Sequence, residues 1–143
     1  MSAESTPTIV IEKTITIAAS PETVWPLLTE PEGVCQWWGT TADVEPRPGG
    51  VYRVTMENGA VMSGEVVDID VPSRLVFTFG WEQPPPAGPV PPGSTRVEIT
   101  LTADGNGTLL QLRHSELPAV QEPDHRGGWD HFFGERLVEA ARS

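Results

Sequence analysis

Cysteine and long apolar runs are nearly absent from this chain of 143 residues. The single cysteine, Cys35, excludes an intramolecular disulfide. No apolar run approaches the ~20 residues that a membrane-spanning helix needs. The N-terminal sequence MSAESTPTIV lacks the basic start and the apolar core of a signal peptide. These absences predict a cytoplasmic protein without a membrane partner.

Basic residues are also scarce. The chain has 9 Lys and Arg against 20 Asp and Glu, which gives a net charge of −11. Such a surface repels phosphate backbones and anionic lipid headgroups. The few basic side chains are scattered singly along the sequence. We therefore expect no binding to nucleic acid and no electrostatic docking to membranes.

Motifs for nucleophilic catalysis, phosphate binding and metal binding are missing. Gly127-Gly128 is followed by neither the spacing nor the lysine of a phosphate loop. His125 and His131 are six positions apart and would lie on different sides of a helix, which fits no compact metal pattern. Cys35 has no histidine near it in sequence and is interpreted as a small packed residue. We expect no metal and no cofactor.

Alternating apolar residues predict a series of strands. A first strand covers 8–18, and others follow at 42–46, 51–56, 60–71, 74–81 and 97–101, with a last strand that contains Leu110 and Leu112. Asn58-Gly59 and the run ADGNG at 103–107 are hairpin signals. Strand 60–71 has two competing apolar faces, which a bulge near Gly64 would reconcile.

Helix signals surround these strands. Ser20-Pro21 begins a helix that Pro26 should shorten or kink, and Glu30-Pro31 begins a second short one. From about 124 to 141 an apolar stripe recurs at intervals of four: Trp129, Phe133, Leu137 and Ala141. This terminal helix must bury its stripe, and the apolar face of the sheet is the only large surface available.

The predicted fold class is α+β. It consists of a curved antiparallel sheet of six to seven strands around a long C-terminal helix, with two short helices after the first strand. We expect residues 1–7 to be disordered and residues 8–143 to form one domain. The segment 82–94 contains six of the 15 prolines and should be an exposed, mobile loop beside a pocket entrance.

Five stretches carry a resemblance to a known family: SPETVWPLLTEPEGVCQWWG at 20–39, GGVYRVTM at 49–56, GEVVDIDVPSRLVFTF at 64–79, GTLLQLRH at 107–114 and GGWDHFFGERLVEAA at 127–141. Together they resemble the helix-grip fold of the SRPBCC (START/Bet v-like) superfamily, and more narrowly its AHSA-like branch, related to the activator of heat-shock protein 90 ATPase. Pro26, Glu30 in place of the usual Asp before Pro, and the proline-rich loop depart from that pattern.

A helix laid across the hollow of a twisted sheet can leave a gap between the two, and small-molecule sites form in such gaps. The resemblance implies a homodimer, since family members often pair. The candidate ligand-binding residues are those predicted to face the cavity between sheet and helix: Trp38, Tyr52, Val54, Met62, Phe77, Phe79, Trp81, Leu112, His114, Trp129 and Phe133. Ordinary core packing is the alternative for each aromatic ring. His114 is alternatively a core histidine with its hydrogen bonds satisfied.

The leading functional hypothesis is the binding of a small apolar molecule in that cavity, without catalysis. Two alternatives stay open. One is a protein-interaction module that modulates a chaperone, as the family name implies. The other is an enzyme of cyclase or hydratase type in which His114 and Tyr52 act as acid and base.

Overall fold

The computed structural model describes residues 7–85 and 88–142. The disorder expected for residues 1–6 lies outside the described residues. Pro7 is the exception within the predicted tail, because its carbonyl accepts a hydrogen bond from the Ala119 amide at 2.9 Å. None of the helices in the described part of the chain is long and apolar enough to cross a membrane.

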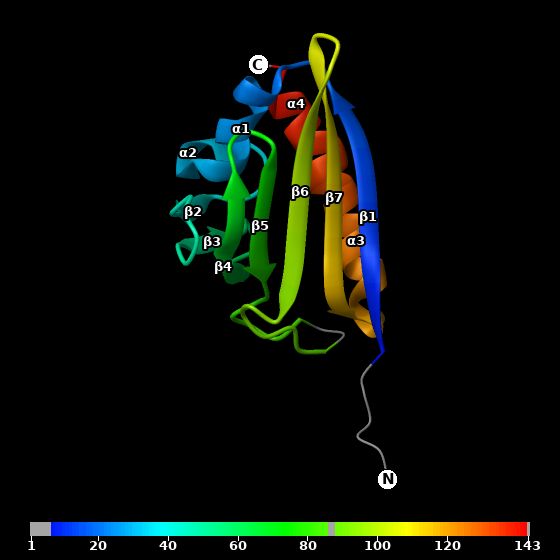
Figure 1. Cartoon of the computed structure of the whole chain (residues 1–143). Helices are drawn as coiled ribbons and strands as arrows, with labels where there is room; N and C mark the ends of the chain where they lie inside the picture. Colours follow the sequence, from blue (N-terminus) through cyan, green and yellow to red (C-terminus); the bar gives the residue numbers. More distant parts are fainter. Residues whose placement is uncertain (1–6, 86–87, 143) are drawn as a thin grey trace.

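The sheet confirms the predicted architecture (Figure 1). It has seven strands: β1 (Thr8–Ile17), β2 (Thr41–Val44), β3 (Val51–Thr55), β4 (Val61–Asp70), β5 (Arg74–Phe79), β6 (Thr95–Asp104) and β7 (Gly107–Pro118). All pairings are antiparallel, in the order β1-β7-β6-β5-β4-β3-β2. The N-terminal strand β1 therefore pairs with the last strand, β7. It lies at the opposite edge of the sheet from β2, the next strand in the sequence.

A register shift in β4 resolves the ambiguous parity of that strand. The shift lies between Val66 and Asp68, somewhat later than the predicted position near Gly64. Met62 and Val66 are buried before it, and after it Ile69 lies opposite the buried Leu75. Because the bulge inserts one extra residue, Ile69 reaches the face of Met62 and Val66, whereas Val67 is exposed.

Two short helices follow β1, as predicted. Ser20 caps α1 (Pro21–Thr29) by accepting a hydrogen bond from the Thr23 amide, and α2 (Pro31–Val34) begins at the second proline signal. Pro26 lies inside α1 and removes one backbone donor, and the helix ends soon after it. Leu27 and Leu28 expose their carbonyls to the core, where they accept side-chain hydrogen bonds.

The C-terminal helix crosses the sheet behind β6 and β7 (Figure 1). After the 3-10 turn η1 (Ala119–Gln121) it continues through α3 (Glu122–His131), the π-helical segment η2 (Phe132–Leu137) and α4 (Val138–Ala140). An α-helix would rotate an every-fourth-residue stripe steadily away from the sheet. The wider π turns counter that drift, so Trp129, Phe133, Leu137 and Ala141 are all buried.

Charge pairing explains the one polar residue on the inner face of β1. Lys13 interrupts the apolar positions of that strand, and its ammonium forms an ion pair with Asp130 of α3. The lysine stem is thereby covered by the helix while the charge stays at the edge of the core.

The proline-rich loop 82–94 lies at the same end of the molecule as the start of α3 (Figure 1). The expectation of a fully exposed loop is wrong at Val90, whose side chain is buried and whose carbonyl accepts a hydrogen bond from the Trp81 amide. Residues 86–87 lie outside the described part of the loop.

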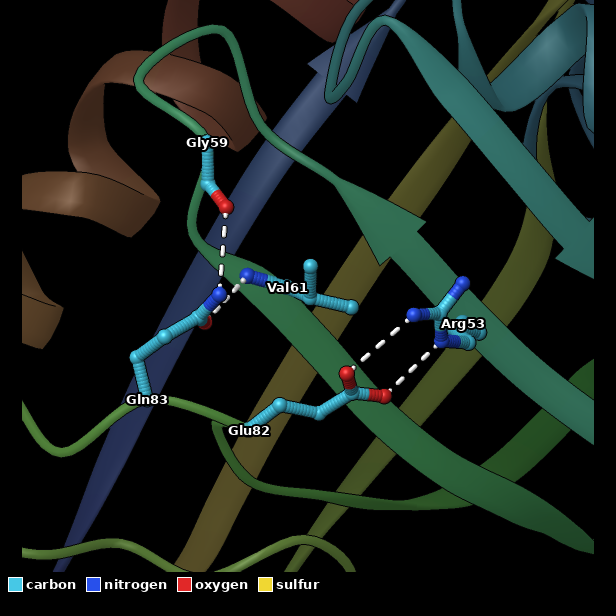
Figure 2. Close-up of polar contacts among 5 residues, drawn as sticks. All are labelled: Arg53, Gly59, Val61, Glu82 and Gln83. Carbon is cyan, nitrogen blue, oxygen red and sulfur yellow. Dashed lines mark hydrogen bonds and ion pairs between the residues drawn. The ribbon is translucent and has the colours of Figure 1, made fainter.

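The start of this loop is fastened to the β3–β4 hairpin (Figure 2). Glu82 accepts two hydrogen bonds from the Arg53 guanidinium, at 2.8 and 3.1 Å. Gln83 accepts from the Val61 amide at 2.9 Å and donates to the Gly59 carbonyl at 3.3 Å. These contacts fix the position of the chain where it enters the proline run.

Candidate functional site

A cavity of about 510 Å³ lies between the sheet and the start of the C-terminal helix. Its floor is formed by Trp38, Phe79 and Trp81. The helix contributes one wall: Gln121, Asp124, His125, Gly128, Trp129 and Phe132. The β3–β4 hairpin and the loop contribute the other: Met56, Glu57, Asn58, Ala60, Gln83, Pro84 and Pro85. Segments distant in sequence thus enclose one space.

Five aromatic rings dominate these walls and are called the outer cluster: Trp38, Phe79, Trp81, Trp129 and Phe132. Trp38 stacks on Phe79 with 6.3 Å between ring centroids and lies 5.3 Å from Trp129. Trp81 meets the edge of Phe79 at 5.4 Å. Trp81 and Phe132 are only half-buried. The cluster therefore presents partly uncovered aromatic faces.

Beneath the cavity, His114 on β7 takes part in a directional chain of hydrogen bonds. The Trp129 indole donates to His114 Nδ1 at 3.0 Å. Thr95 donates its hydroxyl proton to the Phe79 carbonyl at 2.7 Å, so this hydroxyl must accept the 2.8 Å bond from His114 Nε2. His114 is therefore the neutral Nε2–H tautomer, with both nitrogens occupied.

His125 on α3 has the opposite tautomer. Its Nε2 accepts from the Trp81 indole at 3.0 Å, and its Nδ1 donates to the Gln121 carbonyl at 3.0 Å. These two bonds join β5, through Trp81 just beyond it, to the first turn of the helix. His125 thus helps to hold the cavity wall in place.

Burial keeps both histidines neutral. Desolvation lowers the pKa of His114 to about 3, and the charge that His125 would carry acts in the same direction. Desolvation also lowers the pKa of His125, against the opposing effects of the Gln121 carbonyl and of Asp124. A second proton on either ring would break an indole hydrogen bond, so neither histidine is a ready proton donor at neutral pH.

The structure brings four of the eleven sequence-predicted site residues to the cavity: Trp38, Phe79, Trp81 and Trp129. The other seven are buried elsewhere in the core: Tyr52, Val54, Met62, Phe77, Leu112, His114 and Phe133. The Tyr52 hydroxyl donates to the Leu28 carbonyl at 2.6 Å, and burial strongly raises the pKa of this phenol. Tyr52 and His114 therefore contact the core and not the cavity.

Sequence reasoning missed most of the helical wall. Gln121, His125, Gly128 and Phe132 recur at spacings of four, three and four, which is a second helical stripe beside the one that begins at Trp129. The spacing was therefore visible in the sequence. Its mixed polarity hid it, because a search for apolar periodicity passes over glutamine, histidine and glycine.

Within residues 7–85 and 88–142, no group of three or more His, Cys, Asp or Glu side chains is arranged to hold a metal ion. His125 has both nitrogens engaged in protein hydrogen bonds. The absence of a metal and of a cofactor remains a prediction.

Residues 18–142 match the family model described as activator of Hsp90 ATPase homolog 1-like protein. The chain belongs to this family. No curated protein matches the chain. The predicted family resemblance is thereby confirmed over nearly the whole sequence.

Solved structures extend the likeness. The AHSA1-like protein of Rhizobium etli is 39% identical, with 98% of this chain and 86% of that chain covered and a TM-score of 0.74. A protein from Mesorhizobium loti is 27% identical, with coverages of 95% and 97% and a TM-score of 0.78. The Aha1 dimer from Colwellia psychrerythraea shares the fold at 19% identity, with coverages of 93% and 96% and a TM-score of 0.76.

Proposed function

We propose that this member of the family binds a small apolar molecule in the cavity walled by the outer cluster. The observation that carries the proposal is a space of about 510 Å³ beside half-buried aromatic rings. Ligand pockets in proteins fall roughly between 300 and 1,000 Å³ and are lined mainly by apolar and aromatic side chains. A bound apolar molecule would cover the remaining faces of Trp81 and Phe132.

Two adjacent glycines on α3 allow a matched test. A side chain built at Gly128 would enter the cavity wall, whereas Gly127 is exposed and does not line the cavity. A Cβ at either position meets no neighbour within 4 Å. Gly128→Leu should therefore occupy part of the cavity without disrupting the fold, and Gly127→Leu gives the same change in helix propensity outside it.

The measurement is a titration of each protein with Nile red, a neutral apolar fluorophore. Wild type and Gly127→Leu should bind it with similar affinity, and Gly128→Leu should bind it at least about tenfold more weakly, since several ring contacts are lost. Circular dichroism should show all three proteins folded. Equal binding by the two leucine variants would contradict the proposal.

The alternatives have less support in the site. Tyr52 and His114, the residues of the cyclase or hydratase hypothesis, are both buried and both hydrogen-bonded within the core. A chaperone-modulating role rests on the family description alone. We therefore retain ligand binding without catalysis as the proposed function.

We further propose a homodimer in a cytoplasmic setting, without binding to nucleic acid. The family likeness supports self-association, since the solved relative from Colwellia psychrerythraea is a dimer. The net charge of −11 supports the exclusion of nucleic acid. Sedimentation equilibrium would measure the first, and a gel shift with duplex DNA at physiological salt would measure the second.

A further inference from the structure

The charged side chains that line the cavity all carry the same sign. Glu57 lies in the turn between β3 and β4, and Asp124 lies in the first turn of α3, so each of the two walls contributes one carboxylate. Both residues are exposed, and neither forms an ion pair among residues 7–85 and 88–142. No lysine or arginine is among the described residues that line the cavity. The cavity is therefore bordered by uncompensated negative charge.

Positive charge on the neighbouring elements does not cancel these two carboxylates. The arginines of β3 and α3, Arg53 and Arg126, are each paired with a carboxylate outside the lining set, Glu82 and Glu122 respectively. His125 does line the cavity, but burial lowers its pKa, so the imidazole is neutral near pH 7. The electrostatic potential in the cavity is therefore negative.

The charge of Asp124 acts on a group in the cavity wall. It raises the pKa of His125, although burial of the imidazole has the larger, opposite effect. A carboxylate beside a low-dielectric cavity thus influences groups that it does not touch, and a cleft with charge of one sign concentrates the field inside it. A charged ligand would experience the same field.

The rings of the outer cluster can bind a cation as well as an apolar body. The face of an aromatic ring carries partial negative charge, and tryptophan attracts a cation most strongly. The N–H groups of Trp81 and Trp129 are bonded to histidines, while the half-buried rings of Trp81 and Phe132 keep part of their surface open. The Trp38 indole and the Asn58 amide are neutral groups of the wall and do not select a ligand by charge.

We propose that the ligand is an organic cation, an apolar body that carries one ammonium group. This inference rests on the proposed function, since it names the charge of the ligand in the same cavity. The apolar body lies against the outer cluster, and the ammonium is attracted by Glu57, by Asp124 and by the ring faces. An anionic ligand would meet like charge without a counter-ion. Glu57 and Asp124 then determine the specificity for charge.

Three naphthalene probes of similar size test this preference at neutral pH: β-naphthylmethylamine, which is cationic; β-naphthylmethanol, which is neutral; and β-naphthoate, which is anionic. Each is titrated by calorimetry into wild type and two double variants, with Nile red in parallel. The first variant, Glu57→Gln with Asp124→Asn, removes both carboxylates of the cavity wall. The second, Glu65→Gln with Asp70→Asn, is the matched control, because it makes the same substitutions at exposed positions of β4 outside the cavity.

The decisive quantity is the ratio of the affinities for the amine and the alcohol. In wild type and in the control variant the amine should bind about tenfold more tightly, because both carboxylates and the ring faces attract it. In the variant without Glu57 and Asp124 the preference should fall to about threefold or less, since only the ring faces remain. Using a ratio removes any general loss of affinity. β-Naphthoate should bind to wild type more weakly than the alcohol.

A measurement on wild type alone covers the case in which a double variant does not fold. Raising the salt concentration from about 0.1 M to about 1 M shortens the Debye length from ~10 Å to ~3 Å. Because the two carboxylates are exposed, the preference for the amine should fall several-fold over this range. Nile red, which is neutral, should show no such fall.

Nile red binding without a preference for the amine in wild type would overturn this inference and leave the proposed function intact. Equal ratios in the two double variants would do the same, as would a ratio that does not respond to salt. Tighter binding of β-naphthoate than of the amine would also overturn the inference alone. Failure of every probe, Nile red included, would overturn both.

Discussion

The aromatic residues between sheet and helix form two neighbouring groups with different packing. The inner cluster consists of Trp37, Tyr52, Phe77 and Phe133, and each of these side chains is less than 2% exposed. Tyr52 and Phe77 stack at 4.1 Å with their planes 4° apart. The outer cluster has the same kinds of ring, yet it borders a cavity and leaves Trp81 and Phe132 half-covered.

Polar groups are satisfied differently in the two clusters. In the inner cluster Trp37 and Tyr52 donate to the Leu27 and Leu28 carbonyls at the end of α1, each at 2.6 Å. In the outer cluster two indoles donate to histidine nitrogens. The inner arrangement rests on backbone and is independent of pH near neutrality. The outer arrangement depends on two histidine rings that must remain neutral, so acidification should weaken it.

The largest expected effect is in the inner cluster. Phe77→Ala should destabilise the protein by about 3–5 kcal/mol, because a fully packed ring leaves a void that its neighbours cannot fill. Denaturant unfolding measures the loss. Nile red affinity under native conditions should change little, since Phe77 does not line the cavity. A selective loss of Nile red binding with unchanged stability would break the distinction between the clusters.

The next effect is a pH dependence of stability that comes from His114, which accepts a hydrogen bond from Trp129 of the outer cluster. Burial lowers the pKa of His114 from 6.5 to about 3. Between these values His114 binds a proton in the unfolded chain but not in the folded chain. The contribution of neutral His114 to the free energy of unfolding is therefore fully present above pH 6.5 and is lost as the pH falls toward 3. The loss is about 1.4 kcal/mol per pH unit.

His114→Gln removes this titration and keeps groups that can donate and accept. Between pH 6.5 and 5 its free energy of unfolding should fall less steeply with acidification than that of wild type, even though the variant is less stable at pH 7. Urea unfolding at several pH values measures both slopes. His125 titrates in the same sense and remains in both proteins. Parallel slopes would mean that His114 is not held neutral by burial.

A smaller change in stability is expected from the half-buried ring of the outer cluster. Trp81→Ala should cost about 2 kcal/mol or less, because a partly exposed ring has fewer contacts to lose than a buried one. Its effect on ligand affinity should be relatively larger, since Trp81 forms part of the cavity floor. Unfolding and Nile red titration of the same preparation give both values. A stability loss equal to that of Phe77→Ala would place Trp81 with the inner cluster.

The smallest effect concerns the fastening of the loop. Arg53→Gln removes the exposed pair with Glu82, and stability should change little, because exposed ion pairs contribute little to folding. Nile red should bind slightly more weakly if the pair helps to hold Gln83 and the prolines at the cavity. The control is Arg47→Gln, whose partner Glu45 lies away from the cavity. Identical binding by the two variants would mean that the Arg53–Glu82 pair does not position the loop at the cavity.

Several features of the fold could be predicted from the sequence because they depend on local periodicity. Alternation with a period of two marked the strands, and Asn58-Gly59 marked a hairpin with a positive φ at the glycine. The stripe that begins at Trp129 predicted the helix and its contact with the sheet. In the site, Phe79, Trp81 and Trp129 followed from the same patterns.

The sequence by itself thus determined which faces are apolar and in what order the elements follow. The tertiary structure decided where along those faces the packing is complete. His125 meets Trp81 across 44 positions of sequence, and the Gln121 amide is oriented by a carbonyl of the proline-rich loop. Periodicity reports the side of an element that is buried. It does not report how closely the opposite element approaches at each position, and that distance separates the filled inner cluster from the cavity.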